Sequence, residues 1–597
     1  MQKQSSALLL LTLILFFPAV ASIPKVVAQG EVMEFVIAYP SDIGELNPIF
    51  TRSMRSSWYN MLVYDTLLSY DENLNKIPWL AESFSVDGPN VTFTMREGAF
   101  WHDGQQVTPH DVKFTFELIR DGPIDSIGWT FLQHIANVTI RGQDIIVTLD
   151  RVISWAADQL GSLCILPKHI REGVPSDHHS WDDHTNVTAH IGSGMFKYVE
   201  RVPDEFTALE RYDDWWGPSN PYVGQLPNIE ELRIDVIRGQ DARTLAMRNG
   251  DADTEIYEVF GAYVPTILNA PELQLFTGIP TIWEYILGMN TTLPGLDDFE
   301  VRKAIAYAID RQELVNIGRL GFGTVAKSVI PEVFFSGLYH SDGDFPEQNV
   351  TIANQILAAA GWTDTNMNGI RDNGAGVELS YDLWTLSWDD ASIGTGMGLK
   401  LQLEEIGFDI NVMTLDDGPM YVGIFAIPRT FEMFAMGLGF NPYPNHPFGR
   451  MHSENHVDWG GNPYGWINGT FDDILEDYRN ATPSDFPSAA IAVQVAATEN
   501  MPYIPLYLSD DTHAMRAEWT NFSTKPGGPF TLHSPDTLVF MYDSTIEPIP
   551  TPTTSTGTTP TTPPPPLDFD FIMLIGIGAG GIVVGVVCTY LVFRRKS

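Results

Sequence analysis

The chain alternates between short strands and amphipathic helices. Residues 91–95 and residues 229–237 place apolar side chains at every second position, which is typical of strands with one buried face. Thr108 is positioned to cap a helix whose apolar residues recur at helical spacing. Asp297, with Glu300 three residues later, predicts a capping box that opens another helix. These segments predict a mixed α/β body.

Two helix-to-strand units follow in the second half of the chain. A helix over residues 353–360 ends at a glycine and precedes a strand over residues 377–383. A helix over residues 398–406 leads in the same way into a strand over residues 408–415. Alternating helices and strands favour a lobed protein built on a sheet, with ligands bound at the strand ends.

The N-terminus carries a secretion signal. Lys3 is followed by an uncharged apolar run over residues 7–17 and then by small residues. This order is typical of a signal peptide, which we expect to occupy residues 1–28 and to be cleaved after Ala21 or Ala28. No cysteine lies near either position in the sequence, so a lipid anchor at a new N-terminus is not expected.

A second apolar run predicts a membrane anchor near the opposite end. Residues 571–593 carry no charge, and a helix of that length spans about 34 Å against a hydrocarbon core of about 30 Å. Residues 594–597 follow it and are mostly basic, so the positive-inside rule predicts a short cytoplasmic tail there. We therefore expect a single-pass protein of the cell membrane whose body is extracellular.

The segment before this run predicts a stalk. Residues 548–566 contain eight prolines and eight threonines, which favour a stiff polyproline II segment of up to roughly 60 Å. Sequons for N-glycosylation also occur along the body and predict a glycosylated outer surface. They begin at Asn90, Asn137, Asn186, Asn290, Asn349, Asn468, Asn480 and Asn521.

Composition and charge exclude several classes of function. The chain of 597 residues has 34 Lys and Arg against 75 Asp and Glu, a net charge of -41. This balance argues against binding to nucleic acid, to an anionic lipid surface or to an anionic ligand. Cys164 and Cys588 lie on opposite sides of the stalk, so neither a disulfide framework nor a cysteine zinc site is expected. Cys164 lies in an apolar stretch and is predicted to be a small core residue.

Several short motifs occur in order between residues 31 and 543. They are Pro78-Trp-Leu-Ala-Glu-Ser-Phe84, Val91-Thr-Phe-Thr-Met-Arg-Glu-Gly98, Phe100-Trp-His-Asp-Gly104 with Val107-Thr-Pro-His-Asp-Val112, Gly192-Ser-Gly-Met-Phe196, Arg211-Tyr-Asp-Asp-Trp-Trp-Gly217, Leu245-Ala-Met-Arg-Asn-Gly-Asp-Ala-Asp253, Asn290 with Val301-Arg-Lys-Ala-Ile-Ala-Tyr-Ala-Ile-Asp-Arg311, and Pro502-Tyr-Ile-Pro-Leu506. Their succession resembles the extracellular solute-binding proteins of family 5, the dipeptide and oligopeptide group that serves ABC importers. Combined with the C-terminal anchor, it resembles the archaeal type of this family.

The resemblance implies a two-lobed α/β fold of the periplasmic-binding-protein type II class, which closes over a ligand by a hinge motion. One lobe would comprise residues 31–283 and 508–545, and the other residues 284–507, with strands crossing near 281–290 and 503–509. It also implies ABC permease subunits as partners and a peptide or oligosaccharide as cargo, with no cofactor. The alternative is a structural, adhesive or sensory surface protein that reuses this fold, because the stalk and anchor would serve it equally.

The same resemblance indicates where a ligand would bind. Peptide-binding relatives place an acidic residue in a segment of the second lobe, where it pairs with the α-amine of the peptide, and Asn441 takes that position here. An amide does not neutralise a buried ammonium, so the replacement favours a neutral oligosaccharide or peptide, although another acid such as Glu284 would still serve an amine. Aromatic side chains near strand ends would suit sugar rings. The ligand contacts we expect are Asn441, Trp388, Trp384, Phe440, Trp283, Glu284 and Asn47.

Metal and catalytic motifs are incomplete. Residues 364–372 copy the first nine positions of a calcium loop, with oxygen ligands expected at Asp364, Asn366, Asn368 and Asp372. Ala375 takes the twelfth position, which requires Glu, and Glu378 comes three residues late, so we predict a structural turn rather than a metal site. The sequence contains neither a Gly-x-Ser-x-Gly nor a His-Glu-x-x-His motif, and we do not expect an enzyme.

Overall fold

The computed structural model describes residues 32–544, except for residues 45, 51–53, 72–73, 123–128, 175–182, 184, 256–258, 260 and 522–536. The predicted signal peptide, the stalk and the apolar run at residues 571–593 lie outside the described residues. Within the described residues, no helix combines the length and the apolar character that a membrane crossing requires. The structure therefore concerns the body of the chain.

One mixed sheet of eleven strands runs through this body, in the order β15-β14-β16-β12-β17-β11-β1-β10-β9-β8, with β13 paired to β17 outside that path. The strands on one side of β12 and β17 belong to the first lobe, namely β11 (Thr254–Glu255), β1 (Glu34–Tyr39), β10 (Glu231–Val236), β9 (Phe206–Arg211) and β8 (Phe196–Val202). Those beyond β12 belong to the second lobe, namely β16 (Met433–Gly439), β14 (Ser380–Leu386) and β15 (Asp409–Leu415). The second-lobe strand β13 (Gly323–Val325) pairs with β17 on the edge opposite β12.

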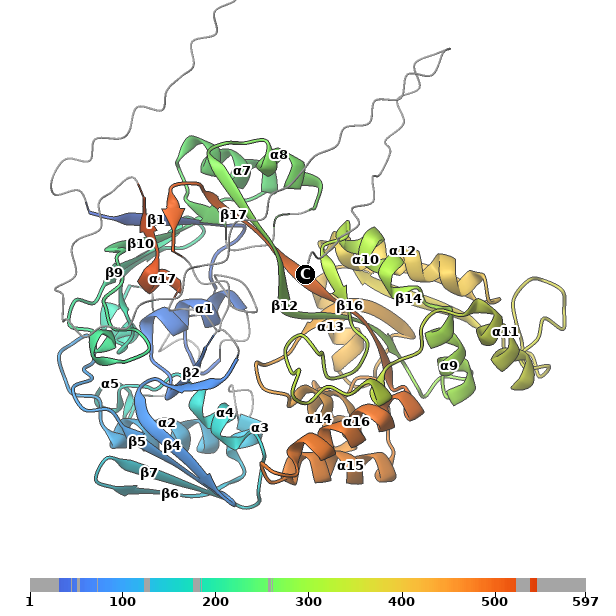
Figure 1. Ribbon diagram of the computed structural model, residues 1–597, viewed down its shortest axis with the longest axis horizontal. Helices are drawn as coiled ribbons and strands as arrows, with labels where there is room; N and C mark the ends of the chain where they lie inside the picture. The colour runs from blue at the N-terminus through green and yellow to red at the C-terminus, as the bar shows by residue number, and fades with distance from the viewer. Residues whose placement is uncertain are drawn as a thin grey trace, which may run out of the picture. The chain divides into compact units, whose positions relative to one another are not determined.

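Two long strands join the lobes. β12 (Leu273–Met289) and β17 (Tyr503–Arg516) pair in antiparallel fashion and cross the middle of the body (Figure 1). Their register shifts between Phe276 and Ile279, and again between Pro280 and Glu284. Irregular pairing of this kind bends a strand and raises its twist. The bend therefore lies where the chain passes from one lobe to the other.

A four-stranded antiparallel sheet, in the order β4-β5-β7-β6, completes the first lobe. Its strands are β4 (Ala81–Asp87), β5 (Asn90–Met95), β7 (Asp144–Leu149) and β6 (Ile135–Arg141). Helix α2 (Pro109–Asp121) starts after Thr108, whose N–H donates to the carboxylate of Asp111 at 2.8 Å, as a capping box requires. The other elements here are α1 (Met54–Val63), the β2 (Leu68–Tyr70) and β3 (Lys76–Pro78) hairpin, α3 (Trp129–Leu132), α4 (Ala156–Gly161), α5 (Lys168–Arg171), α7 (Gln240–Asn249) and α8 (Val264–Leu268).

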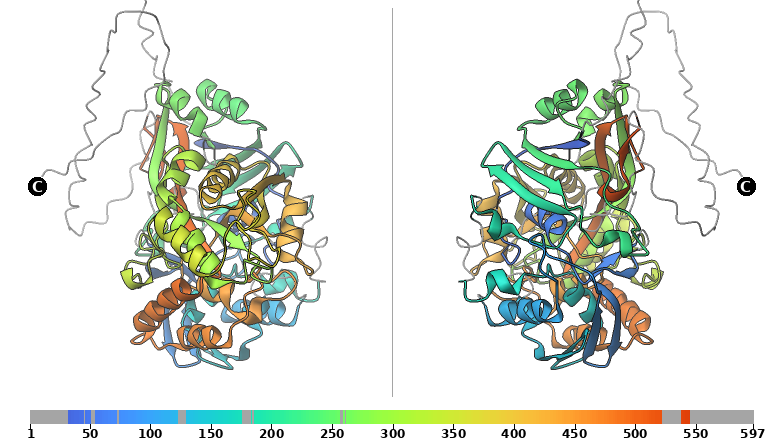
Figure 2. Two further views of the ribbon diagram at one scale, coloured as in Figure 1. Left: turned by 90° about the vertical axis from the view of Figure 1, so that its right-hand side faces the viewer. Right: turned by 90° about the vertical axis from the view of Figure 1, so that its left-hand side faces the viewer.

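The second lobe is richer in helices. They are α9 (Phe299–Ala308), α10 (Arg311–Arg319), α11 (Val350–Ala359), α12 (Asp390–Glu404), α13 (Asp417–Phe425), α14 (His446–Met451), α15 (Gly469–Asn480) and α16 (Phe486–Asn500). Both side views show the orange helices of this lobe, α15 and α16, at the same end of the body as the blue strands of the small sheet (Figure 2). Helices α7 and α8, in green, lie at the opposite end.

Two of the predicted helix starts need correction. The cap of α9 is Asp298, which accepts the N–H of Glu300 at 2.9 Å, whereas the predicted cap Asp297 accepts the N–H of Gly295. Helix α12 starts at Asp390, eight residues before the predicted start, because Asp389 caps it. Its glycines concealed this start, since they weaken a helical pattern. Gly394 is needed there: a β-carbon on it would lie 3.1 Å from the backbone of the neighbouring helix α10.

A buried carboxylate ties two motif segments of the first lobe together. Asp65 accepts hydrogen bonds from the indole N–H groups of Trp79 and Trp216 at 3.0 and 2.8 Å, and Trp215 packs against both rings. Asp65 is 3% exposed, and burial raises its pKa to about 6 although these hydrogen bonds oppose the shift. The folded protein therefore holds a proton at this site that the unfolded chain releases at lower pH.

This proton makes the stability of the first lobe depend on pH. Because the pKa of Asp65 is higher in the folded state, its contribution is fully present below pH 4 and is lost as pH rises to about 6. We expect Asp65→Asn, which carries no charge, to gain stability relative to the wild type across this window, by up to about 3 kcal/mol. Thermal melting at pH 4.5 and pH 7.5 measures the difference. Asp87→Asn, at an exposed position, is the control. If the melting temperatures of Asp65→Asn and of the wild type changed equally between the two pH values, the raised pKa of Asp65 would be contradicted.

Candidate functional site

A pocket of about 220 Å³ lies where the two lobes meet. The first lobe supplies most of its wall, from the segment after β1, from α1 and β2, and from the segment after α4. The second lobe supplies the segment after β16. The lining residues are Pro48, Ile49, Ser57, Asn60, Met61, Thr66, Leu68, Ser69, Tyr70, Ile119, Ser162, Leu163, Cys164, Leu166, Asn441, Pro442 and Tyr443.

The pocket wall is uncharged and largely apolar. None of its lining residues is an acid or a base, and eight of them are Ile, Leu, Met or Pro. The hydroxyl of Tyr70 donates to the buried Asp158 at 3.2 Å, and Lys76 pairs with that carboxylate at 2.9 Å. Burial raises the pKa of the Cys164 thiol to about 12, so this side chain presents a neutral sulfur. Such a wall accepts an uncharged, apolar group of a solute.

The second-lobe wall comes from a short segment directly after β16. Asn441 is exposed, and its side-chain amide donates to the Oδ1 atom of Asn445 at 3.1 Å. Pro442 and Tyr443 are buried beside it. Helix α14 then starts at His446. The predicted ligand residue Asn441 therefore lies in the pocket lining, where its amide places hydrogen-bonding groups without a charge.

Asn47 has a structural position beneath the pocket. Its side chain is fully buried, and its Oδ1 atom accepts the N–H of Ile49 at 3.1 Å. This bond turns the chain after β1, so that Pro48 and Ile49 form the pocket wall. Asn47 itself is not among the lining residues, and it acts on the pocket through its neighbours.

Glu284 is not open to a solute. It lies in β12, is fully buried, and its carboxylate binds the guanidinium of Arg450 from α14. Arg450 also donates to the carbonyl oxygens of Leu438 and Gly439 at 3.0 and 3.2 Å. Burial raises the pKa of Glu284, and the Arg450 charge opposes that shift. In this structure the carboxylate of Glu284 is closed to solvent and paired with Arg450, so its use as a counter-charge for a peptide amine stays a prediction.

The predicted aromatic contacts have differing environments. Phe440 is buried and packs against Phe334 and His446, with ring centroids 5.1 and 5.0 Å away. Trp384 is half-buried, with its ring against Gly423 of α13. Trp388 is 46% exposed, and its indole N–H donates to Asp417 at the start of α13.

Trp283 is half-buried in β12, next to the backbone of β16. None of the four predicted aromatic residues lines the pocket. Of these four rings, that of Trp388 has the largest surface open to solvent.

The calcium-like loop satisfies its own polar groups. Asp364 accepts the N–H groups of Asn368 and Gly369, and Thr365 donates to the carboxylate of Asp372. Glu378 closes the loop although it comes late in the sequence. Its Oε1 atom lies 2.9 and 2.8 Å from the side-chain nitrogens of Asn366 and Asn368. The loop is thus a hydrogen-bonded turn beside β14.

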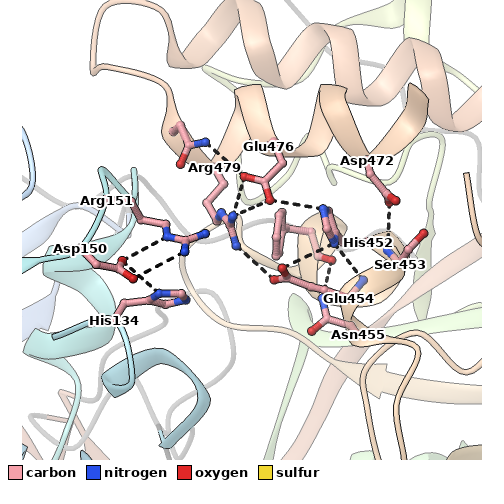
Figure 3. A network of polar contacts seen from close by, with 12 residues as sticks. His134, Asp150, Arg151, His452, Ser453, Glu454, Asn455, Asp472, Glu476 and Arg479 are labelled. Atoms are coloured by element: carbon pink, nitrogen blue, oxygen red, sulfur yellow. Dashed lines mark hydrogen bonds and ion pairs between the residues drawn. The ribbon is translucent and has the colours of Figure 1, made fainter. Parts of the chain in front are cut away.

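One group of described residues has the composition of a metal site. His452, Glu454 and Glu476 bring one ligand atom each within 4.8 Å of one another (Figure 3). The guanidinium of Arg479 already pairs with both carboxylates. Nδ1 of His452 accepts the N–H of Glu454 at 3.0 Å, so the neutral ring carries its proton on the nitrogen that faces Glu476. Both carboxylates of the group are thus already paired with a cation, and the contacts among these residues form an ion-pair network.

The first-lobe wall of the pocket was not predicted from the sequence. Residues 57–70 and 162–166 supply most of it, and their apolar runs are typical of an ordinary core. The available signal was the interruption of these runs by Ser, Asn and Thr, which line the pocket as Ser57, Asn60, Thr66, Ser69 and Ser162.

Comparison with known proteins identifies the family. The model of the family described as "Bacterial extracellular solute-binding proteins, family 5 Middle" matches residues 75–457 of the chain. The chain is 26% identical over 494 residues to the oligopeptide-binding protein AppA of Bacillus subtilis, covering 81% of this chain and 88% of AppA. It is 24% identical over 440 residues to the nickel-binding periplasmic protein of Escherichia coli, covering 71% and 79% of the two chains.

Solved structures show the same fold. The structure of B. subtilis AppA in complex with a nonapeptide superposes with a TM-score of 0.69 at 23% identity, covering 85% of this chain and 99% of AppA. An oligopeptide-binding protein of Thermotoga maritima gives a TM-score of 0.72 at 19% identity, covering 85% and 98%. The body thus has the predicted α/β fold of type II periplasmic binding proteins. Because the family match covers more than half of the sequence, the chain belongs to the family 5 extracellular solute-binding proteins, the non-enzymatic substrate-binding components of ABC importers.

Proposed function

We propose that this protein captures an oligopeptide through an uncharged apolar side chain and delivers it to an ABC permease. The observation that carries the proposal is the pocket between the lobes, whose lining contains no charged residue. Its volume of about 220 Å³ holds roughly seven water molecules at 30 Å³ each, which suits one large side chain rather than a whole solute. The rest of the solute would extend out of the pocket.

The amino end of such a peptide finds no carboxylate in this pocket. Asn441 stands at the pocket in place of an acid, and the carboxylate of Glu284 is engaged by Arg450. Burying an unpaired ammonium costs several kcal/mol, so the bound peptide either keeps its amine in water or lacks a charged amine. We therefore propose selectivity for peptides whose buried part is neutral.

An oligosaccharide is the second candidate. The half-exposed ring of Trp388 favours it, since sugars stack on exposed aromatic faces. The aliphatic pocket favours the peptide, because sugar hydroxyls buried against Ile49, Leu68 and Leu163 would lose hydrogen bonds to water. The peptide is therefore our first proposal.

We also propose that the protein is tethered to the outer face of the cell membrane. The support is the sequence alone, namely the apolar run at residues 571–593, the basic residues after it and the signal peptide before the body. A stalk over residues 548–566 would let a tethered binding protein reach its permease.

A matched peptide screen tests the ligand. We expect N-acetylated hexapeptides that contain leucine to raise the melting temperature of the full chain at least as much as their free-amine forms. The reason is that the pocket offers an amine no counter-charge. Peptides in which aspartate replaces the leucine should have little effect. A ligand at 100 times its dissociation constant stabilises the protein by about 2.7 kcal/mol.

Asn441→Asp sharpens this test. The new carboxylate should strengthen the binding of free-amine peptides about tenfold and leave acetylated peptides unchanged, as the pairing of a buried amine predicts. Asn269→Asp, an exposed change outside the pocket, is the control. If only cellohexaose or maltohexaose shifts the melting temperature, the carbohydrate proposal replaces the peptide proposal.

Protease treatment of intact cells tests the tether. We expect a protease added outside to release a soluble body after cleavage within residues 548–566, because a segment of this proline and threonine composition is not expected to form a core. Deletion of residues 571–597 should send the body into the medium without protease. Full protection of the chain until the cells are lysed would refute this topology.

A further inference from the structure

The lobes also touch at a place separate from the β12–β17 crossing. The contact joins residues 150–155 of the first lobe, which follow β7, to helices α14 and α15 of the second lobe. It lies at the end of the body that holds the small sheet and helices α15 and α16 (Figure 2). A contact between hinged lobes has a consequence for their motion, because it exists only when the lobes are together.

Ser154 caps helix α15 from the opposite lobe. Its backbone N–H donates to the carbonyl oxygen of Arg479 at 2.7 Å. Its hydroxyl lies 2.9 Å from the same oxygen and 2.7 Å from the carbonyl oxygen of Ala481. The last carbonyls of a helix have no partner within the helix. A residue of one lobe thus satisfies the exposed end of a helix that belongs to the other.

Trp155 inserts its ring next to this cap. Its ring centroid lies 6.0 Å from that of Phe448 in α14 and 5.5 Å from that of Tyr478 in α15. Trp155, Phe448 and Tyr478 are 5%, 6% and 0% exposed. Separation of the lobes would return these aromatic surfaces to water, which costs about 25 cal/mol per Å² of apolar area.

Ion pairs fix the position of the second-lobe residues at this contact. Arg479 has 4% of its side chain exposed, pairs with Glu454 and Glu476, and lies 4.5 Å above the Phe448 ring. These contacts fix the last turn of α15 and the ring that receives Trp155. In Figure 3 the His134–Asp150–Arg151 group of the first lobe faces this network.

Arg151 adds a long-range attraction. The pKa of Arg151 is raised, first by its hydrogen bond to Asp150 and further by the charges of Glu476 and Glu454 across the contact. The first-lobe cation therefore faces second-lobe carboxylates.

Helix α14 links this contact to the hinge and to the pocket. Phe448 receives Trp155, and two residues later Arg450 binds Glu284 in the crossing strand β12. The segment directly before α14 contributes Asn441 to the pocket, and the Asn441 amide binds Asn445, the residue that precedes the helix. One segment of eleven residues thus touches the pocket, the contact and the hinge.

We propose that Ser154 and Trp155 form a latch that closes the lobes by capping α15. The latch adds its own free energy to closure, in addition to what a solute contributes in the pocket. It sets the fraction of protein that is closed before any solute binds, and the apparent affinity for the solute follows that fraction.

Single-molecule energy transfer on the full chain tests the latch without a solute. Dyes are attached at Glu200→Cys in the first lobe and Glu405→Cys in the second, both exposed, after both native cysteines are replaced by alanine. We expect the ligand-free protein to populate a high-transfer closed state. Ser154→Ala should lower the ratio of closed to open molecules about fivefold, the equivalent of one hydroxyl hydrogen bond.

Two further variants complete the test. Ser219→Ala is the matched control, since its hydroxyl donates to the carbonyl of Trp216 within the first lobe and should leave the ratio unchanged. Trp155→Phe keeps an aromatic ring but shortens it, and should also favour the open state. If Ser154→Ala fails to fold, the ratio of closed to open molecules in Trp155→Phe tests the latch instead.

Two outcomes would overturn the proposal. One is a ligand-free wild type that shows only the low-transfer state. The other is an unchanged ratio in folded Ser154→Ala and Trp155→Phe proteins. Because no solute is present, neither result depends on the ligand proposed above.

Discussion

The antiparallel pairing of β12 with β17 joins the two lobes through one continuous sheet. Every other part of the molecule depends on it, because these strands pair with the first-lobe strand β11 at one end and with the second-lobe strand β16 at the other. Regular pairing along their whole length would make a rigid bridge. The register shifts between Phe276 and Ile286 instead interrupt the ladder, and irregular pairing of this kind bends and twists a strand.

A buried ion pair near this crossing fixes helix α14 against the strand β12. Glu284 lies within the irregular stretch, between its second and third register shifts, and is fully buried against Arg450. A buried ion pair contributes little net stability, but the loss of one partner is expensive, since the other charge stays buried and unpaired. The pair therefore fixes α14 against β12. Since α14 follows directly on the Asn441 segment, the position of the pocket wall is set by the hinge strand.

Sequence reasoning predicted local elements well where the signal is local. Strands β5 and β10 follow from alternation, and the cap at Thr108 from its capping box. The predicted start of α12 was wrong because its glycines allow a close contact with α10, and tertiary packing of this kind leaves no local signal in the sequence. The ion pair of Glu284 could not be predicted for the same reason, since its partner Arg450 comes 166 residues later. Asn441 could be placed only through the family resemblance, and the first-lobe wall of the pocket carried no distinctive pattern.

The proposed pocket and latch both act on the equilibrium between open and closed lobes, but through different interactions. If the pocket receives a peptide side chain as proposed, it would gain free energy from apolar area, which any side chain of suitable size supplies, so it would give affinity with modest discrimination between side chains. The latch gains from hydrogen bonds and ring contacts that are independent of the solute. If the latch alone closed the lobes completely, a bound and an empty protein would look alike to the permease. Its strength must therefore leave the open state populated, and a contact built on one serine and one tryptophan meets that requirement.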